Sequence, residues 1–245
     1  NLSQYIKLIR DGDTLIIVGG DGTLNYAINF LYGKIPFDRV YYYPAGSGND
    51  FAHDVESTEK FMGFLIPMKK FIRDLPLVTV NGKKRYFLNG IGFGIDGYCC
   101  EMGDEQRKVS TEKINYAAIA IKGLFGKFKP CNGIINVDGE IRKFKKIWLA
   151  PTMLGKYYGG GMMVAPTQDR LNRERTVTVV IWHGSGKLKT LMMFPKIFEG
   201  THLKYKNNIK CFTGHSITVE FEKPQALQID GETVKNVTSY TVNYD

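Results

Sequence analysis

Hydrophobic residues near the start of the chain follow first the pattern of a strand and then that of a helix. Residues 15–18 form a continuous apolar run, which is typical of a buried strand. The next apolar residues have the spacing of one face of a helix and are Leu24, Ala27, Ile28 and Leu31. The pattern therefore predicts a strand joined directly to an amphipathic helix.

Two further elements of this kind are predicted in the first 76 residues. A short strand covers residues 40–43 and ends at Pro44, and residues 57–72 carry apolar residues at helical spacing. The strand and helix with which an α/β nucleotide-binding unit normally opens are missing from residues 1–13. This part is therefore predicted to be an α/β domain that lacks its first strand and helix.

From Leu77 onward, apolar and polar residues alternate with the period of β-strands. Asn81-Gly82 lies between two such segments and predicts a hairpin with a type I′ turn. One helix is predicted over residues 114–125, and short strands over residues 135–144, 148–150, 176–182, 217–221 and 227–234. We therefore predict two domains, an α/β domain over residues 1–76 and an antiparallel sandwich or barrel over residues 77–245.

A glycine turn, Gly-Gly-Asp-Gly-Thr at residues 19–23, joins the first predicted strand to its helix. This arrangement points backbone N–H groups and the positive end of a helix dipole at an anion such as phosphate. A tight turn without a ligand explains the three glycines equally well. Asp21 favours a ligand, because a carboxylate beside a phosphate requires Mg²⁺ or another positive charge between them.

A second glycine loop, residues 46–52, follows the strand that ends at Pro44. It carries a hydroxyl, an amide and a carboxylate on Ser47, Asn49 and Asp50. Parallel strands end at the same edge of a sheet, so the two loops are expected to meet at one crevice.

Three other motifs are weaker. Residues 92–97 match GxGxxG, but a dinucleotide site needs a helix at Gly97, which residues 98–103 do not predict. Residues 184–187 resemble the end of a P-loop without its other required residues, and predict a turn. The tripeptide Asp-Gly-Glu occurs at residues 138–140 and 230–232, and turn chemistry alone does not distinguish the two copies.

The charge of the chain favours an anionic partner. The sequence has 33 Lys and Arg against 24 Asp and Glu, a net charge of +9. Basic groups without interleaved aromatic residues argue against nucleic acid. The four cysteines have no CxxC spacing, so neither a disulfide framework nor a zinc site is predicted, and a cytoplasmic setting is expected. No apolar stretch is long enough to span a membrane, and no signal peptide is visible.

Taken together, these motifs resemble the lipid kinase family of the bacterial diacylglycerol kinases, which includes sphingosine and ceramide kinases. The resemblance rests on residues 19–23, 46–52, 89–96, 159–166 and 228–232, which occur in the family's order. The first motif alone also resembles NAD kinases and phosphofructokinases. The resemblance implies an N-terminal Rossmann-like domain and a C-terminal β-sandwich, with ATP and Mg²⁺ in the cleft between them.

The resemblance also implies roles for particular residues. Asp230 and Glu232 inherit the role of general base, whereas Asp138 and Glu140 do not. Nucleotide binding is assigned to Gly19, Gly20, Asp21, Gly22, Thr23, Leu24, Asn25, Ser47, Gly48, Asn49 and Asp50. Mg²⁺ and its waters are assigned to Asp21, Asp50 and Asp96.

The sequence departs from the family at three places. The opening strand with its phosphate loop is absent, and His53 stands where the family often has arginine. Residues 171–175 replace the Asp-Gly that helps the family bind a structural metal, so that metal is not expected here.

We therefore predict an ATP-dependent lipid kinase of phospholipid biosynthesis, which phosphorylates a hydroxyl of diacylglycerol or a related lipid. It is expected to lie peripherally at the anionic inner face of the cytoplasmic membrane, where basic residues are stabilising. Two alternatives remain, namely a soluble kinase of the NAD kinase type and a non-catalytic regulator that binds nucleotide or lipid. The sequence leaves open the acceptor lipid and whether the protein is a homodimer.

Overall fold

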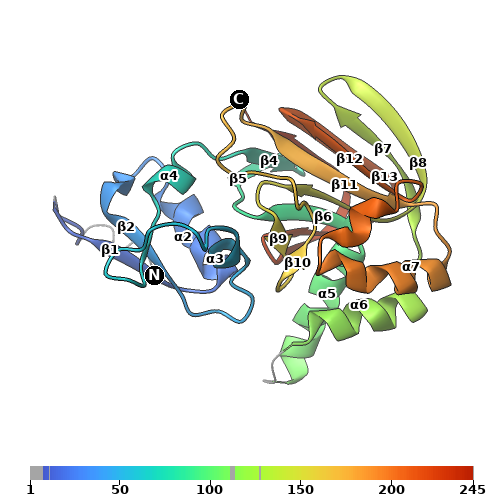
Figure 1. Ribbon diagram of the computed structural model, residues 1–245, viewed down its shortest axis with the longest axis horizontal. Coiled ribbons are helices and arrows are strands. Elements are labelled where there is room, and N and C mark those ends of the chain that lie inside the picture. Colours follow the sequence, from blue (N-terminus) through green and yellow to red (C-terminus); the bar gives the residue numbers. More distant parts are fainter. Residues whose placement is uncertain (1–7, 11, 111–113, 127, 245) are drawn as a thin grey trace.

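Two β-sheets of different size organise the chain, which a computed structural model describes over residues 8–10, 12–110, 114–126 and 128–244. A three-stranded sheet forms the N-terminal part, and a nine-stranded sheet forms most of the rest. Figure 1 shows the two parts side by side, with the smaller one in blue. This arrangement confirms the predicted class, an α/β part followed by an antiparallel β-rich part.

The small sheet has the order β1-β2-β3. Strand β1 (Leu15–Gly19) pairs in parallel with β2 (Val40–Pro44), and helix α2 (Asp21–Leu31) connects them. The apolar positions predicted for this helix are confirmed, because all four are at least 95% buried. The predicted full burial of β1 is wrong, since Ile16 and Val18 are 45% and 57% exposed. Ile17, which lies on the alternate face of the strand, is 6% exposed, so β1 is buried on one face and exposed on the other.

The helix predicted over residues 57–72 is wrong for most of its length. Only α4 (Lys69–Ile72) is helical, and Ile66–Pro67 forms strand β3 on the edge of β2. Pro67 could not continue a helix, because it lacks a backbone N–H and clashes with the preceding turn. Phe61 packs instead on a strand residue, with its ring centroid 4.8 Å from that of Tyr41.

The predicted hairpin at the start of the second part is confirmed. Strands β4 (Leu77–Val80) and β5 (Lys83–Tyr86) pair antiparallel across Asn81-Gly82. Both turn residues have positive φ, 48° and 73°, as a type I′ turn requires. The domain boundary predicted at residue 76 stays a prediction, and the large sheet begins one residue later.

All strand pairs of the large sheet are antiparallel. Besides the hairpin it contains β6 (Gly90–Gly94), β7 (Cys131–Val137), β8 (Glu140–Met153), β11 (Val177–His183), β12 (Ile209–Gly214), β13 (Ser216–Ile229) and β14 (Glu232–Asn243). The long strands β8 and β13 each pair with β7 along one half and with β6 along the other. The sheet therefore bends over on itself around a continuous core, as a sandwich does.

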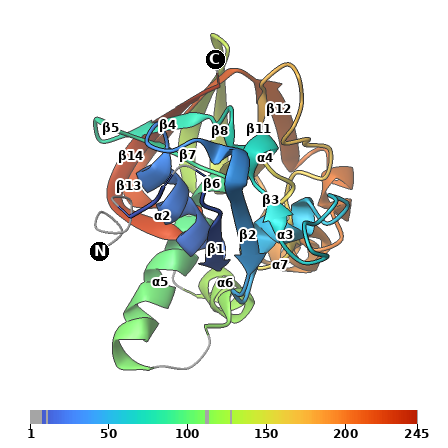
Figure 2. The ribbon, with the colours of Figure 1, turned by 90° about the vertical axis from the view of Figure 1, so that its left-hand side faces the viewer.

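Three helices lie together at one end of the C-terminal part in both views (Figures 1 and 2). They are α5 (Ile95–Val109), α6 (Tyr116–Phe125) and α7 (Lys187–Met193), and the 3₁₀ turns η2 (Phe194–Ile197) and η3 (Thr201–Lys204) follow α7. Helix α6 confirms the prediction for residues 114–125. None of the helices that the described residues form is long and apolar enough to cross a bilayer.

Helix α5 was not predicted, and it begins immediately after strand β6 within the GxGxxG match. Strand β6 pairs antiparallel with β8 and β13, so the motif does not belong to a parallel βαβ unit. Its glycine has a packing role instead. A Cβ on Gly97 would lie 1.8 Å from the carbonyl oxygen of Ala226, so only glycine allows α5 to pack this closely on β13.

The two parts share one hydrophobic core. Side chains of α2 and β2, such as Leu24 and Tyr42, belong to the same buried cluster as Val78 and Ile91 of the large sheet. A remaining helix, α3 (Asp50–Asp54), follows the second glycine loop and contacts β9 (Tyr157–Tyr158), which pairs with β10 (Met162–Met163). The loops between the two parts are therefore held from both sides.

Candidate functional site

A cavity of about 860 Å³ lies where the two glycine loops of the small sheet meet the large sheet and helices α5 and α6. Of the residues predicted from the sequence, it is lined by Gly20, Asp21, Gly22, Thr23, Ser47, Gly48, Asp50, Asp96, Asp230 and Glu232. Gly19, Leu24, Asn25 and Asn49 do not line it. Leu24 belongs to the hydrophobic core, and the side chain of Asn49 closes its own loop on Gly46.

The two glycine loops are in backbone contact, as the parallel pairing of β1 and β2 predicts. A Cβ on Gly46 would lie 2.4 Å from the Cα of Gly20. Any side chain at residue 46 would therefore push the loops apart, which explains why this position is a glycine.

The first turn of α2 forms one wall of the cavity. Its residues Asp21, Gly22 and Thr23 line the space, and within the described part of the chain no side chain caps this helix. The backbone N–H groups of a first helical turn have no partner inside the helix. Together with the helix dipole, they provide a binding site for an anion.

The side chain of Asp21 turns away from these N–H groups and joins the two loops. Its Oδ2 accepts from the backbone N–H of Asp50 at 3.0 Å, and its Oδ1 from that of Phe51 at 2.9 Å. Asp21 therefore caps the start of α3. Its carboxylate is already stabilised by protein donors, which the sequence did not reveal.

Asp50 continues the connection to the C-terminal part. Its two oxygens accept from the N–H groups of Gly160 and Gly161 at 2.9 and 2.7 Å. Residues 159–161 all have positive φ, from 66° to 102°, which three glycines adopt without strain. Burial, and less strongly the negative charge of Asp21, raise the pKa of Asp50 to about 6.

Asp230 is 7% exposed and is bound by four donors. Its Oδ1 accepts from the N–H groups of Asn89 and Gly90 at 2.8 and 2.9 Å. Its Oδ2 accepts from the N–H of Leu88 and from Nδ2 of Asn25, both at 2.6 Å. Burial raises the pKa of Asp230, and the three backbone donors act against that shift.

The Asp-Gly-Glu copy at residues 138–140 has a similar backbone conformation to the copy at residues 230–232 but lies elsewhere in the fold. Asp138 and Asp230 both have positive φ, 51° and 46°, at the first position of a hairpin turn. Asp138 accepts from the N–H groups of His215 and Ser216 and does not line the cavity. Local sequence makes both turns, and only the tertiary fold brings Asp230 to the site.

Glu232 lies at the exposed rim, where it is linked to Asp230 through two other residues. Arg85 binds Glu232 Oε2 at 2.6 Å and Asn25 Oδ1 at 2.7 Å. Asn25 in turn donates to Asp230. The side chain of Asn25 therefore connects Arg85 with Asp230 and does not line the cavity.

Sequence reasoning assigned no role to Asn89, which is 3% exposed and connects the carboxylates of the site. Its Nδ2 donates to Asp21 at 3.0 Å, and its backbone N–H donates to Asp230. Its Oδ1 accepts from Arg170 at 3.1 Å. The available signal was a polar residue at the start of the resemblance motif of residues 89–96.

A buried ion pair was also missed. Arg170 and Asp54 are bonded directly, with side chains only 5% and 3% exposed, and Arg170 also donates to the carbonyl of Leu88. Asp54 is the last residue of α3, whereas Arg170 lies in the C-terminal part, between β10 and β11. The pair therefore fixes α3 against the C-terminal part, and no spacing in the sequence indicates it.

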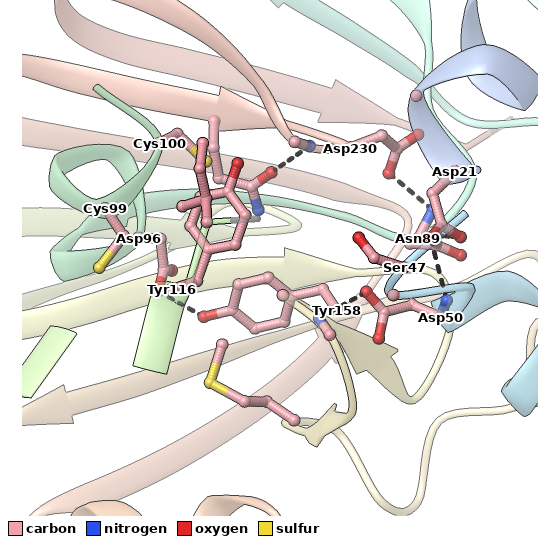
Figure 3. A pocket seen from close by; sticks show the side chains of 18 of the residues that line it. Asp21, Ser47, Asp50, Asn89, Asp96, Cys99, Cys100, Tyr116, Tyr158 and Asp230 are labelled. Carbon is pink, nitrogen blue, oxygen red and sulfur yellow. Dashed lines mark hydrogen bonds between the residues drawn. The ribbon is translucent and has the colours of Figure 1, made fainter. Parts of the chain in front are cut away.

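Asp96 lies apart from Asp21 and Asp50, with Tyr158 between them (Figure 3). Tyr158 donates its hydroxyl to Asp96 Oδ1, while Oδ2 is buried and finds no partner among the described residues. The structure thus does not bring the three predicted metal ligands together. Its described part contains no group of three or more His, Cys, Asp or Glu side chains that could hold a metal ion.

A second unpartnered atom lies next to Asp96. Gly92 is paired across the strands with Gln228, and a Cβ on Gly92 would lie 2.3 Å from Asp96 Oδ2. Nε2 of Gln228 is buried and likewise has no partner within the described residues. A carboxyl oxygen and an amide nitrogen therefore remain unsatisfied on neighbouring residues, and both residues line the cavity. Buried groups of this kind suit a polar ligand.

Burial raises the pKa of Asp96 to about 7, which predicts a pH-dependent stability. Folded Asp96 keeps a proton that the unfolded chain releases near pH 4, so its contribution to stability falls as the pH rises from about 4 to 7. The free energy of unfolding of Asp96→Asn should lack this fall. Denaturation of wild type and Asp96→Asn from pH 4 to 8 would measure the free energy of unfolding of each. Glu140→Gln, at an exposed carboxylate, is the control. Parallel curves for wild type and Asp96→Asn would contradict the prediction.

The part of the cavity along α5, α6 and η2 is mostly apolar, although Arg107 and Asn115 also line it. Its lining includes Ile95 and Cys99 of α5, Tyr116 and Ala120 of α6, and Phe194 and Phe198 around η2. Burial raises the pKa of the neighbouring Cys100 thiol to about 12, so this end carries no thiolate at neutral pH. The cavity therefore has an anion-binding end and an apolar end, as an amphipathic ligand requires.

Two family models match this chain and together cover most of it. Residues 2–76 match the diacylglycerol kinase catalytic domain, and residues 89–242 match the YegS C-terminal NAD kinase beta sandwich-like domain. The second match alone covers more than half of the chain.

Individual relatives agree with these matches. The chain is 28% identical to the "Putative lipid kinase YtlR" of Bacillus subtilis, over 94% of this chain and 75% of that protein. It is 24% identical to a diacylglycerol kinase of Mycobacterium tuberculosis, over 78% of this chain and 62% of that protein. A solved diacylglycerol kinase from Bacillus anthracis shares the fold, with a TM-score of 0.63 and 21% identity over 98% of this chain and 78% of that one.

Proposed function

Because this chain belongs to the diacylglycerol kinase family and is therefore a kinase, we propose that it transfers the γ-phosphate of ATP to a hydroxyl of diacylglycerol or a related lipid. One observation carries this proposal. A single cavity joins the N-terminus of α2, the buried carboxylate of Asp230 and an apolar chamber. Phosphate donor, acceptor hydroxyl and acyl chain each find a suitable surface in it.

The polar end would hold the nucleotide. The N–H groups at the start of α2 would bind phosphate oxygens, with Ser47 and Gly48 facing them from the second loop. Tight backbone contact between the loops makes this surface rigid. Such preorganised donors stabilise the charge that develops during phosphoryl transfer.

The carboxylates of Asp21 and Asp50 fit Mg²⁺, whereas Asp96 does not. Oδ2 of Asp21 and Oδ2 of Asp50 lie 3.6 and 3.5 Å from the position of a Cβ on Gly48, so they flank one point of the cavity wall. Mg²⁺ in kinases takes one or two carboxylates, together with waters and substrate phosphates. When bound, it would neutralise charge on the β- and γ-phosphates.

Asp230 would act as general base, with Glu232 supporting it through Arg85 and Asn25. A substrate hydroxyl can reach Asp230 Oδ2 by taking the place of Asn25, because Nδ2 of Asn25 has a second acceptor in the carbonyl of Tyr86 at 3.2 Å. As the hydroxyl oxygen bonds to the γ-phosphorus, its proton passes to Asp230 and the bond to the leaving ADP breaks. The raised pKa of Asp230 favours this proton transfer.

The lipid would enter from the apolar end, with its polar head beside the unpartnered atoms of Asp96 and Gln228. Nε2 of Gln228 offers a donor, and Oδ2 of Asp96 offers an acceptor when ionised and a donor when protonated, to a second hydroxyl or an ester carbonyl. The apolar chamber between α5, α6 and η2 would take the acyl chain. We place this reaction at the inner face of the cytoplasmic membrane, because the proposed lipid substrate would lie in a bilayer.

Transfer of labelled phosphate from ATP to a panel of lipids in mixed micelles with Mg²⁺ tests the proposal. We expect transfer to one class of lipid that carries a free hydroxyl. NAD in the same panel tests the alternative of an NAD kinase-like enzyme, and transfer to NAD alone would reject a lipid acceptor. ATP binding without transfer to any acceptor would favour a regulator.

A further inference from the structure

Helices α6 and α7 expose large apolar side chains on their outer surfaces. Ile121 and Phe125 of α6 are 42% and 68% exposed, and Leu188 and Met192 of α7 are 73% and 71% exposed. Within each helix the two residues are four positions apart, so they lie on one face. We call this surface, made by these four residues, the two-helix face.

The four side chains point away from the same core. Ala120 and Leu124 of α6 and Met193 of α7 belong to one buried cluster, which includes Trp148 of the large sheet. The helices lie next to each other (Figure 1), and Lys187 at the start of α7 donates to the carbonyl of Gly126 at 3.1 Å. With their inner sides on one core, both helices turn their exposed sides outward.

The helices that carry this apolar surface also carry positive charge. Helices α6 and α7 contain Lys122, Lys187 and Lys189 and no aspartate or glutamate, whereas Lys196 of η2 is paired with Glu199 at 3.2 Å. Exposed apolar side chains among lysines are the composition of helices that lie in the headgroup region of an anionic membrane. A protein partner with a matching acidic and apolar surface is the competing explanation.

The two-helix face also lies beside the apolar end of the cavity. Phe198, directly after η2, lines the cavity and is 39% exposed, so it stands at the rim. Its ring centroid lies 6.2 Å from that of Phe194, which is buried in the core below α7. A bilayer on this face would therefore adjoin the apolar part of the cavity lining.

We propose that the two-helix face docks on the surface of an anionic lipid bilayer, with its apolar side chains among the headgroups and its lysines at anionic lipids. This inference rests on the proposed function, because a lipid kinase must take its substrate from a membrane. Each lysine near such a surface contributes about a fivefold gain in affinity, and each large apolar side chain that is buried about tenfold or more.

Sedimentation with lipid vesicles, without ATP, tests the docking. Wild-type protein should bind vesicles of phosphatidylglycerol and phosphatidylcholine more tightly than vesicles of phosphatidylcholine alone. The double variant Phe125→Ser and Leu188→Ser should lose about tenfold or more in affinity. Its matched control is Ile141→Ser, which is 65% exposed on β8 and should bind as wild type does.

Charge reversal separates the contribution of the lysines to vesicle binding from that of the apolar side chains. Lys122→Glu with Lys189→Glu should abolish the preference for phosphatidylglycerol, whereas Lys143→Glu with Lys145→Glu on β8 should lower binding much less. Equal loss in both pairs would show attraction by net charge alone and would overturn the proposal. Wild-type vesicle binding by the serine variant would overturn it as well, as would a stable dimer that only the variants of the face dissociate.

The docking and the proposed function can fail separately. The face variants should keep wild-type transfer to a short-chain lipid that is dispersed as monomers, because none of the substituted residues lines the cavity. They should lose transfer to the same headgroup in vesicles. Vesicle binding through the face without transfer to any lipid would reject the kinase proposal and leave the docking in place.

Discussion

Replacing Asp230 by asparagine is expected to lower kcat for phosphoryl transfer by about 10²–10⁴-fold, the range that a general base contributes. The asparagine cannot accept the hydroxyl proton. Nucleotide binding should remain, because the start of α2 and the loop at Ser47 follow strands of the small sheet, whereas Asp230 lies in the turn between β13 and β14 of the large sheet. Rapid-quench measurement of kcat, with ATP binding by calorimetry, would check both parts.

The other Asp-Gly-Glu tripeptide, at residues 138–140, provides the control for this variant. Asp138→Asn removes a carboxylate that accepts backbone N–H groups in the same type of turn but does not line the cavity. It should lower the melting temperature while leaving kcat unchanged. If Asp230→Asn kept wild-type turnover, or if both variants lost activity in proportion to stability, Asp230 would not be the base.

Replacing Arg170 by methionine is expected to lower the free energy of unfolding by about 3–5 kcal/mol, as is typical when one member of a buried ion pair is removed. The change leaves the carboxylate of Asp54 buried, and the N–H of Lys156, at 3.2 Å, is then its remaining donor among the described residues. It also removes the donors to Leu88 and Asn89. Urea denaturation, followed by the fluorescence of the two tryptophans, would measure the loss.

Arg175 offers a matched control, because its ion pair with Asp74 is about half exposed on both sides. Arg175→Met should cost about 0–1 kcal/mol, the range of surface ion pairs. The double variant Asp54→Leu with Arg170→Met should recover part of the stability, since no buried charge is then left unpaired. Equal destabilisation by the two arginine variants would show that the buried pair does not hold α3 in place.

Wherever structure depends on neighbouring residues alone, the sequence was sufficient. Helix α2 follows from four apolar positions on one face, and the β4–β5 hairpin from Asn81-Gly82, whose residues adopt positive φ at little cost. The meeting of the two glycine loops also followed, because parallel strands must end at one edge. The motifs at those loops were sufficient for the family resemblance, which the family matches confirm.

Where a residue's partner is distant in the sequence, only the tertiary structure determined the element or contact that the residue forms. Helical spacing over residues 57–72 was overruled by packing on β2 and by Pro67, and α5 forms at residues whose periodicity did not predict it. The donors to Asp230 lie 140 or more residues away, and those to Asp138 belong to another turn. Identical tripeptides therefore have different surroundings, because hydrogen bonding and burial depend on what the fold places beside them.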